Sequence, residues 1–200
     1  MIARLRKTLK DHPFVTLQKV LSRVPGRPME LAIFTVLQLD GVPRISSLGT
    51  GLTIRYAGRE DLEQLANCAD RREIFQQRFD DGDYCLVAES GDEIAGFVRF
   101  CTDRVYTEDR FLYSLLVPPN AVYCFDGYTK PSYRRRGILK ALMGKVGRWM
   151  QDNGKTTTVA IVELGNYISW NTQVKGGFVP LRRVKYLRLF RRRWFFSSAV

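Results

Sequence analysis

The sequence is short of the residues that build a metal centre. It holds one histidine, His12, and four cysteines, no two of which form a CxxC pair. A structural zinc site needs four clustered Cys or His ligands, so we expect no bound metal. Three of the cysteines fall inside apolar runs, and all four are predicted to be buried free thiols, which favours a cytoplasmic location. They are Cys68, Cys85, Cys101 and Cys124.

Long apolar stretches are also missing. No run approaches the ~20 apolar residues that span a bilayer. Residues Met1–Lys7 interleave charged with apolar side chains, so we expect no signal peptide. No internal repeat is present either. Hydrophobic residues make up 45% and charged residues 26% of the chain, close to the average of soluble proteins. A length of 200 residues suits one domain with a sizeable core.

The net charge of +12 is confined to the two ends of the chain. Residues 1–44 hold eight Lys or Arg and three acids, residues 181–200 hold seven and none, and the stretch between them is neutral. We expect a basic amphipathic helix over Ile2–Val24, interrupted at Pro13. Three interpretations of the basic ends stay open: packing onto the domain, peripheral association with an anionic membrane, or binding of an acidic partner or nucleic acid. No specific nucleic-acid partner is expected.

The hydrophobic pattern predicts helices and strands in alternation. Residues 1–50 are interpreted as an N-terminal extension with an extra strand over Glu30–Asp40, residues 51–190 as the main domain, and residues 191–200 as a basic and aromatic tail. Within the domain, strands are expected at 52–56, 84–89, 94–100, 121–129, 156–163 and 178–190, and helices at 59–69, 71–80, 136–153 and 166–175. Residues 102–120 are expected to form a surface loop with some extended structure. The predicted fold class is α/β (α+β), with a mostly antiparallel sheet flanked by helices.

The segment from Tyr128 to Met143 carries the most informative pattern. A strand ends at Pro131, a basic loop follows with Arg134, Arg135, Arg136 and Gly137, and an amphipathic helix begins at once. Unpaired backbone N–H groups and the positive end of the helix dipole would then face one concavity, which suits a pyrophosphate. The loop by itself is equally compatible with a basic turn that only caps a helix.

A second segment narrows the choice. Asn166 and Ser169 follow the next strand, and Gly177-Phe178 follows the next helix. With Pro131, Tyr133, Arg134 and Gly137 in this order and spacing, the chain resembles the GNAT superfamily of acyl-CoA N-acyltransferases over about Leu52–Phe190. The resemblance implies a GNAT fold, acetyl-CoA as co-substrate and an amine as acceptor. It leaves the identity of the acceptor and the oligomeric state open.

The same resemblance assigns site residues. It implies that the loop and first helical turn bind the CoA pyrophosphate through Arg134, Arg135, Arg136, Gly137, Ile138, Leu139 and Lys140. Tyr128 and Thr129 would pair with the pantetheine arm, and Asn166 would contact it. The strands 121–129 and 156–163 would splay apart to admit the acyl thioester, which the amine attacks directly, with the oxyanion held by a backbone N–H.

Catalytic side chains follow less directly from the sequence. Asp126 and Glu163 are carboxylates near the expected gap and are candidate general bases, although each would also fit a structural ion pair. Tyr128 is a candidate proton donor, as is Tyr123, or either is a packing residue. Two positions depart from the family pattern: Leu139 replaces a small residue, and Gln173 replaces the tyrosine that often protonates the thiolate. A non-catalytic CoA-binding or membrane-surface module is therefore the alternative to an active enzyme.

Overall fold

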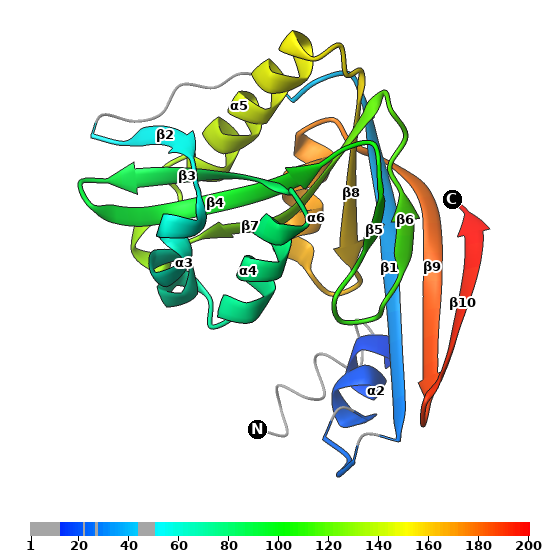
Figure 1. The fold of residues 1–200 in the computed structure, drawn as a ribbon. Coiled ribbons are helices and arrows are strands. Elements are labelled where there is room, and N and C mark those ends of the chain that lie inside the picture. The colour runs from blue at the N-terminus through cyan, green and yellow to red at the C-terminus, as the bar shows by residue number, and fades with distance from the viewer. Residues whose placement is uncertain (1–12, 22, 27, 44–50) are drawn as a thin grey trace. The chain divides into compact units, whose positions relative to one another are not determined.

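The computed structural model describes residues 13–21, 23–26, 28–43 and 51–200. The chain divides into two compact units (Figure 1). The central unit comprises residues 39–107 and 114–160, and the terminal unit comprises residues 1–38, 108–113 and 161–200. Of the helix expected over Ile2–Val24, the part before Pro13 lies outside the described residues, as do residues 44–50 at the end of the expected N-terminal extension.

The central unit is built on a twisted sheet with the strand order β8-β7-β4-β3-β2. Its strands are β2 (Thr53–Tyr56), β3 (Tyr84–Ser90), β4 (Glu93–Cys101), β7 (Ala121–Thr129) and the first residues of β8 (Thr157–Glu163). Neighbouring strands run antiparallel except for β7 and β8, which are parallel. A parallel pair needs a crossover connection, and the helix that follows β7 supplies it.

Helices cover both faces of this sheet (Figure 1). On one face, α5 (Ile138–Asp152) buries Leu142, Val146 and Met150 against a core cluster that includes Leu86 and Val122. On the other face, the short turn η1 (Arg59–Asp61), α3 (Leu62–Cys68) and α4 (Arg72–Asp80) cover the alternate residues of the same strands. Successive residues of β3 and β4 point to opposite faces of the sheet, so the apolar residues of these strands contribute to two cores.

The segment 102–120 contains the extended structure that we expected, but it is more buried than a surface loop. It contains a hairpin of β5 (Val105–Thr107) and β6 (Ser114–Leu116), and Tyr106, Leu115 and Val117 are buried. The Tyr106 ring lies 4.7 Å from that of Tyr123 and 4.6 Å from that of Phe125. The isolated aromatic residues of this segment give no periodic pattern, although they pack into the core.

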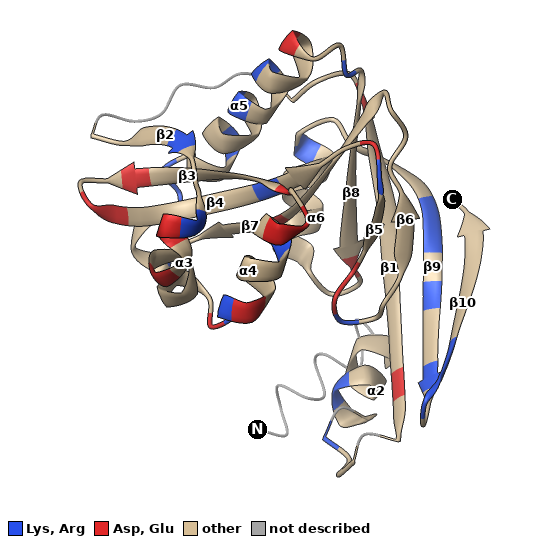
Figure 2. Ribbon diagram, in the orientation of Figure 1, with Lys and Arg blue, Asp and Glu red and all other residues tan. Residues whose placement is uncertain are grey.

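The terminal unit contains α2 (Pro13–Leu21), β1 (Met29–Asp40), the end of β8, α6 (Tyr167–Lys175), β9 (Val179–Leu189) and β10 (Arg192–Ala199). Its strands follow the order β10-β9-β1, all antiparallel. Most of the segment that we expected to be a C-terminal tail is thus the strand β10. Basic residues lie along β9 and at the turn into β10 (Figure 2).

The expected fold class is confirmed: the strands form a mostly antiparallel sheet flanked by helices. All four cysteines are buried free thiols, as predicted. In the part of the chain that the structure describes, each helix is too short or too polar to cross a lipid bilayer. The described residues likewise contain no cluster of acidic, Cys or His side chains that would hold a metal ion.

Candidate functional site

The connection from β7 to α5 forms a sharply folded basic loop. After the short 3-10 turn η2 (Pro131–Tyr133), Arg135 and Gly137 both take left-handed backbone conformations, with φ of 66° and 75°. The Arg134 side chain donates to the carbonyl oxygen of Thr129 at 3.3 Å. The base of the loop is tied to Glu93, which accepts hydrogen bonds from Lys130 Nζ and the Tyr133 hydroxyl, both at 2.8 Å. These two bonds, with Lys130 the stronger influence, lower the pKa of Glu93.

The first turn of α5, directly after the loop, contains backbone N–H groups without hydrogen-bond acceptors. Gly137 is the N-cap and has no side chain to accept from the helix, and no acidic residue lies in the first turn. The N–H groups of Ile138, Leu139 and Lys140 consequently have no intrahelical acceptor. Arg134, Arg135, Arg136 and Gly137 are exposed, and the space beside Gly137 is open to at least 4 Å from an added Cβ. A helix N-terminus of this kind, with added guanidinium groups, fits a diphosphate.

Leu139, which replaces a small residue of the family pattern, turns away from this loop. Its side chain packs against the core cluster beneath α5. It also lies over Gly127, where an added Cβ would stand 3.2 Å from Leu139 Cδ1. The absence of a side chain at position 127 therefore makes room for Leu139, and the anion-facing side of the loop is not narrowed by it.

The strand β7 is irregular in its second half. The registered pairing with β8 comprises three pairs and ends at Tyr123 and Val159. On its other edge, β7 pairs with β4 through a bulge, and Asp126 within this bulge has a φ of 50°. A bulge of this kind bends the strand and redirects a side chain. The second half of β7, including Tyr128 and Thr129, has no described ladder to β8.

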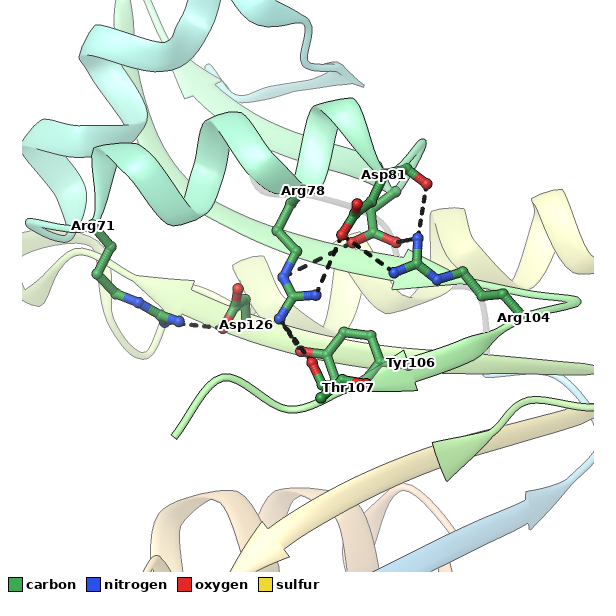
Figure 3. A network of polar contacts seen from close by, with 8 residues as sticks. Arg71, Arg78, Asp81, Arg104, Tyr106, Thr107 and Asp126 are labelled. Atoms are coloured by element: carbon green, nitrogen blue, oxygen red, sulfur yellow. Dashed lines mark hydrogen bonds and ion pairs between the residues drawn. The ribbon is translucent and has the colours of Figure 1, made fainter. Parts of the chain in front are cut away.

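The bulge directs Asp126 toward an arginine from the opposite layer of the central unit. Asp126 Oδ1 accepts a hydrogen bond from Nη1 of Arg71, the residue immediately before α4, at 3.1 Å (Figure 3). The Asp126 side chain is 15% exposed, and its Oδ2 is buried without a hydrogen-bond partner. A buried carboxylate oxygen with no donor is costly unless a ligand or water fills the place of the partner.

Arg99, which we did not single out from the sequence, lies close to this carboxylate. It is fully buried on β4, in register with Phe125, and its guanidinium lies 5.0 Å from the Phe75 ring and 4.6 Å from the Phe79 ring. None of its three side-chain nitrogens has a hydrogen-bond partner. Burial lowers the pKa of Arg99, and the charge of Asp126 is among the influences that oppose this shift. Arg99 thus supplies positive potential to the Asp126 carboxylate without a direct bond.

A second buried acid, Asp83, lies between α4 and β3. Its carboxylate is paired with Arg104 Nη1 at 3.0 Å and lies 4.0 Å from Arg78 Nε. Arg78 also donates to the Tyr106 hydroxyl at 3.0 Å and to the carbonyl of Thr107 at 3.3 Å (Figure 3). Burial raises the pKa of Asp83 to about 6, against the attraction of both arginines. This network fixes α4 to the β5–β6 hairpin.

Glu163 and Asn166, the other predicted site residues, belong to the terminal unit. Glu163 Oε1 accepts from Gln18 Nε2 at 2.5 Å, and Arg110 Nη1 donates to Glu163 Oε2 at 3.0 Å. Asn166 is the N-cap of α6, and its Oδ1 accepts from the Ser169 N–H at 3.1 Å. Glu163 and Asn166 line one cavity of about 450 Å³ together with Gln18 and Arg110. The ion pair is the structural role that we considered for Glu163.

The aromatic candidates on β7 are packed. Tyr128 is half-buried and its ring stacks on Phe97 at 5.5 Å, whereas Tyr123 is buried against Phe125 at 5.3 Å. Gln173 is half-buried on α6 in the terminal unit. The structure therefore brings Asp126, Tyr128, Thr129 and the loop 134–140 together within the central unit. Glu163 and Asn166 lie together in the terminal unit.

Comparisons with known proteins agree with this geometry. Solved structures with the same fold include a GNAT-family protein from Novosphingobium aromaticivorans, at a TM-score of 0.59 and 17% identity over 81% of this chain and 68% of that one. A protein from Staphylococcus epidermidis matches with a TM-score of 0.56 and 13% identity over 88% of this chain and 68% of that one. The aminoglycoside acetyltransferase AAC(6')-Iy, in complex with a bisubstrate analogue, matches with 0.51 and 18% over 74% and 99%.

Sequence comparison assigns the family. No curated protein matches the chain significantly. Residues 54–178 match the model of the acetyltransferase (GNAT) family, and this span holds β2 to α6, including the β7 bulge and the loop before α5. The chain belongs to the acetyltransferase (GNAT) family.

Proposed function

We propose that this protein transfers an acetyl group from acetyl-CoA to a primary amine. The observation that carries the proposal is the uncapped N-terminus of α5, where left-handed Arg135 and Gly137 leave backbone donors open beside exposed arginines. One structural neighbour, AAC(6')-Iy, has been solved in complex with CoA. Four free buried thiols are in keeping with a cytoplasmic location, which is part of the proposal.

The loop before α5 and the strand β7 bind different parts of acetyl-CoA. The backbone amides from Arg135 to Lys140 hold the diphosphate, and Arg134 adds charge. Tyr128 and Thr129 present backbone groups to the pantetheine arm from the part of β7 that has no ladder to β8. For Asn166, which belongs to the terminal unit and whose carbonyl oxygen caps α6, contact with the pantetheine arm stays a prediction from the sequence.

Asp126 is the general base that the geometry favours. The neutral amine attacks the thioester carbonyl, a C–N bond forms, the C–S bond breaks, and CoA leaves as a thiolate. Asp126 Oδ2 is free to accept the amine proton, because Arg71 engages only Oδ1. Both oxygens of Glu163 already accept hydrogen bonds. Tyr128 is the candidate donor to the thiolate, although the thiolate of a thiol with a pKa of ~8.5 also leaves without a dedicated acid.

The first experiment places acetyl-CoA on the loop. We expect acetyl-CoA at ~100 times its dissociation constant to raise the melting temperature by about 5–10 °C, as about 2.7 kcal/mol of binding would. The Gly137→Glu variant should lose this rise, because a carboxylate would occupy the diphosphate position. Gly154→Glu is the matched control: Gly154 follows the other end of α5, with a φ of 65° and open space beside it. Equal losses in both variants would refute binding at this loop.

The second experiment tests the role of Asp126. Asp126→Asn keeps the shape and removes the base, so kcat/KM with a responsive amine should fall about 10²–10⁴-fold. The acetyl-CoA-induced rise in melting temperature should remain. Asp92→Asn, in the exposed turn between β3 and β4, provides a control of the same chemistry. If Asp126→Asn retains full activity across the pH range, another group removes the proton.

A CoA-binding module without catalysis is the competing function, because Gln173 cannot act as an acid. The same assays separate the two. Acetyl-CoA binding that persists with no release of free CoA across a broad panel of primary amines would favour the module over the enzyme. Release of CoA together with an acetylated amine, detected by mass spectrometry, would support the enzyme and identify its acceptor.

A further inference from the structure

One face of the β9–β10 hairpin combines apolar and basic side chains. The register pairs Leu189 with Arg192, Leu187 with Trp194, and Lys185 with Phe196, so these six residues share one face of the sheet. We call this set the hairpin face. Met29, Leu31 and Ile33 of β1 are in register with its β9 residues and extend the same face by one strand. The face is therefore continuous across three antiparallel strands.

The opposite side of the same strands is the interior of the terminal unit. Phe195 lies 5.4 Å from the Tyr113 ring and 5.3 Å from the Tyr186 ring, and Tyr186 lies 4.9 Å from Phe111. Tyr186 is 2% exposed. The interior thus takes its apolar residues from the alternate positions, and the apolar residues of the hairpin face are not needed to fill it.

The hairpin face presents its apolar side chains to solvent. The exposed fraction is 42% for Leu189, 36% for Trp194 and 57% for Phe196. Phe190, in the turn between the two strands, is 70% exposed and is followed by Arg191. Lys185 and Arg192 lie on the face itself, with Arg183 one pair further along, and the described residues of β9 and β10 include no acid (Figure 2). Exposed apolar surface with charge of one sign marks an interaction site.

The composition of this surface identifies its partner. A second copy of the chain would bring the same cations against each other, which is unfavourable. A single-stranded nucleic acid would stack its bases on aromatic rings, but aliphatic residues make up half of the apolar positions on the hairpin face and all of those that β1 adds. Aliphatic and aromatic side chains ringed by Lys and Arg match the boundary between acyl chains and anionic headgroups. We propose that the hairpin face binds the surface of an anionic lipid bilayer, with Phe190 and Phe196 inserted.

The proposal is tested by vesicle co-sedimentation of the full chain. Vesicles of phosphatidylcholine with ~30% phosphatidylglycerol should bind the protein at low salt, and vesicles of phosphatidylcholine alone should not. Lys185→Gln combined with Arg192→Gln should weaken binding about 25-fold, at about fivefold for each cation. Lys145→Gln combined with Arg148→Gln, two exposed positions on α5, removes the same charge elsewhere and should leave the affinity within about threefold.

The apolar contribution needs its own variant. Phe190→Ser combined with Phe196→Ser alters two highly exposed side chains, so the melting temperature should stay unchanged while vesicle binding falls at least ~10-fold. Absence of binding to the anionic vesicles, equal effects of the two charge variants, or no effect of the serine variant would each overturn the proposal. So would tighter binding to a single-stranded RNA than to the vesicles.

Discussion

Asp83 is the residue whose ionisation most directly links the core to pH. Its side chain is fully buried, and burial raises its pKa from 3.8 to about 6. In the unfolded chain the pKa of an aspartate is about 3.9. The folded protein therefore binds a proton more tightly than the unfolded chain between about pH 4 and pH 6. Stability from this group is present below that window and is lost as the pH rises through it.

Asp83→Asn removes this dependence. Relative to the variant, the wild type should lose about 2 kcal/mol of unfolding free energy between about pH 4.5 and pH 7.5, measured by urea denaturation. Asp152→Asn, at an exposed position at the end of α5, should show no comparable change with pH. A constant difference between wild type and Asp83→Asn would mean that Arg104 and Arg78 fully compensate the buried charge.

Some residues of the site carry no sequence signal. Arg99 sits in an apolar strand, and nothing in that pattern tells a buried arginine from one that reaches solvent. Arg71 and Asp126 are 55 positions apart and meet through the tertiary fold. The bulge gives Asp126 a left-handed backbone, and because this position is not a glycine, the sequence does not predict the bulge. The candidate base was identified by residue type and strand, while its partners required the structure.

At the scale of elements, hydrophobic periodicity predicted the helices that bury one face against the sheet. The helix expected over 136–153 is α5, because Leu142, Val146 and Met150 recur at helical spacing and are buried. The helix begins two residues later than expected, because Arg135 and Gly137 both have left-handed backbone conformations and belong to the preceding turn. The two strands of the β5–β6 hairpin could not be located within the extended structure expected for 102–120, because each has three residues, too few to show alternation.

The basic C-terminal segment was predicted only in part, since one of its two strands was expected and the other was not. The strand expected over 178–190 is β9, whose alternate residues Val184 and Tyr186 are buried. Residues 191–200 were interpreted as a tail from their basic and aromatic composition, whereas the cross-strand register with β9 makes most of them the strand β10. A charged strand at the edge of a sheet also discourages unwanted pairing with other chains.

At the scale of the whole molecule, the residues predicted for the site belong to two compact units, each described by itself. The loop 134–140 and Asp126 belong to the central unit, and Glu163, Asn166 and the hairpin face belong to the terminal unit. The terminal unit is held by an aromatic cluster of Phe34, Phe111, Tyr113, Tyr186 and Phe195. Damage to this cluster should therefore change stability without touching the donors at the start of α5.

Phe195 and Phe196 are neighbours in sequence and point to opposite faces of β10, which makes them a matched pair. Phe195→Ala removes a ring that contacts Tyr113 and Tyr186, and should destabilise the protein by about 2 kcal/mol, lowering the melting temperature by about 4–8 °C. Phe196→Ala should change it by less than about 2 °C, because that ring is 57% exposed. Acetyl-CoA should stabilise both variants as it does the wild type. Equal destabilisation by the two substitutions would show that β10 does not hold the register described, and the hairpin face would then lose its basis.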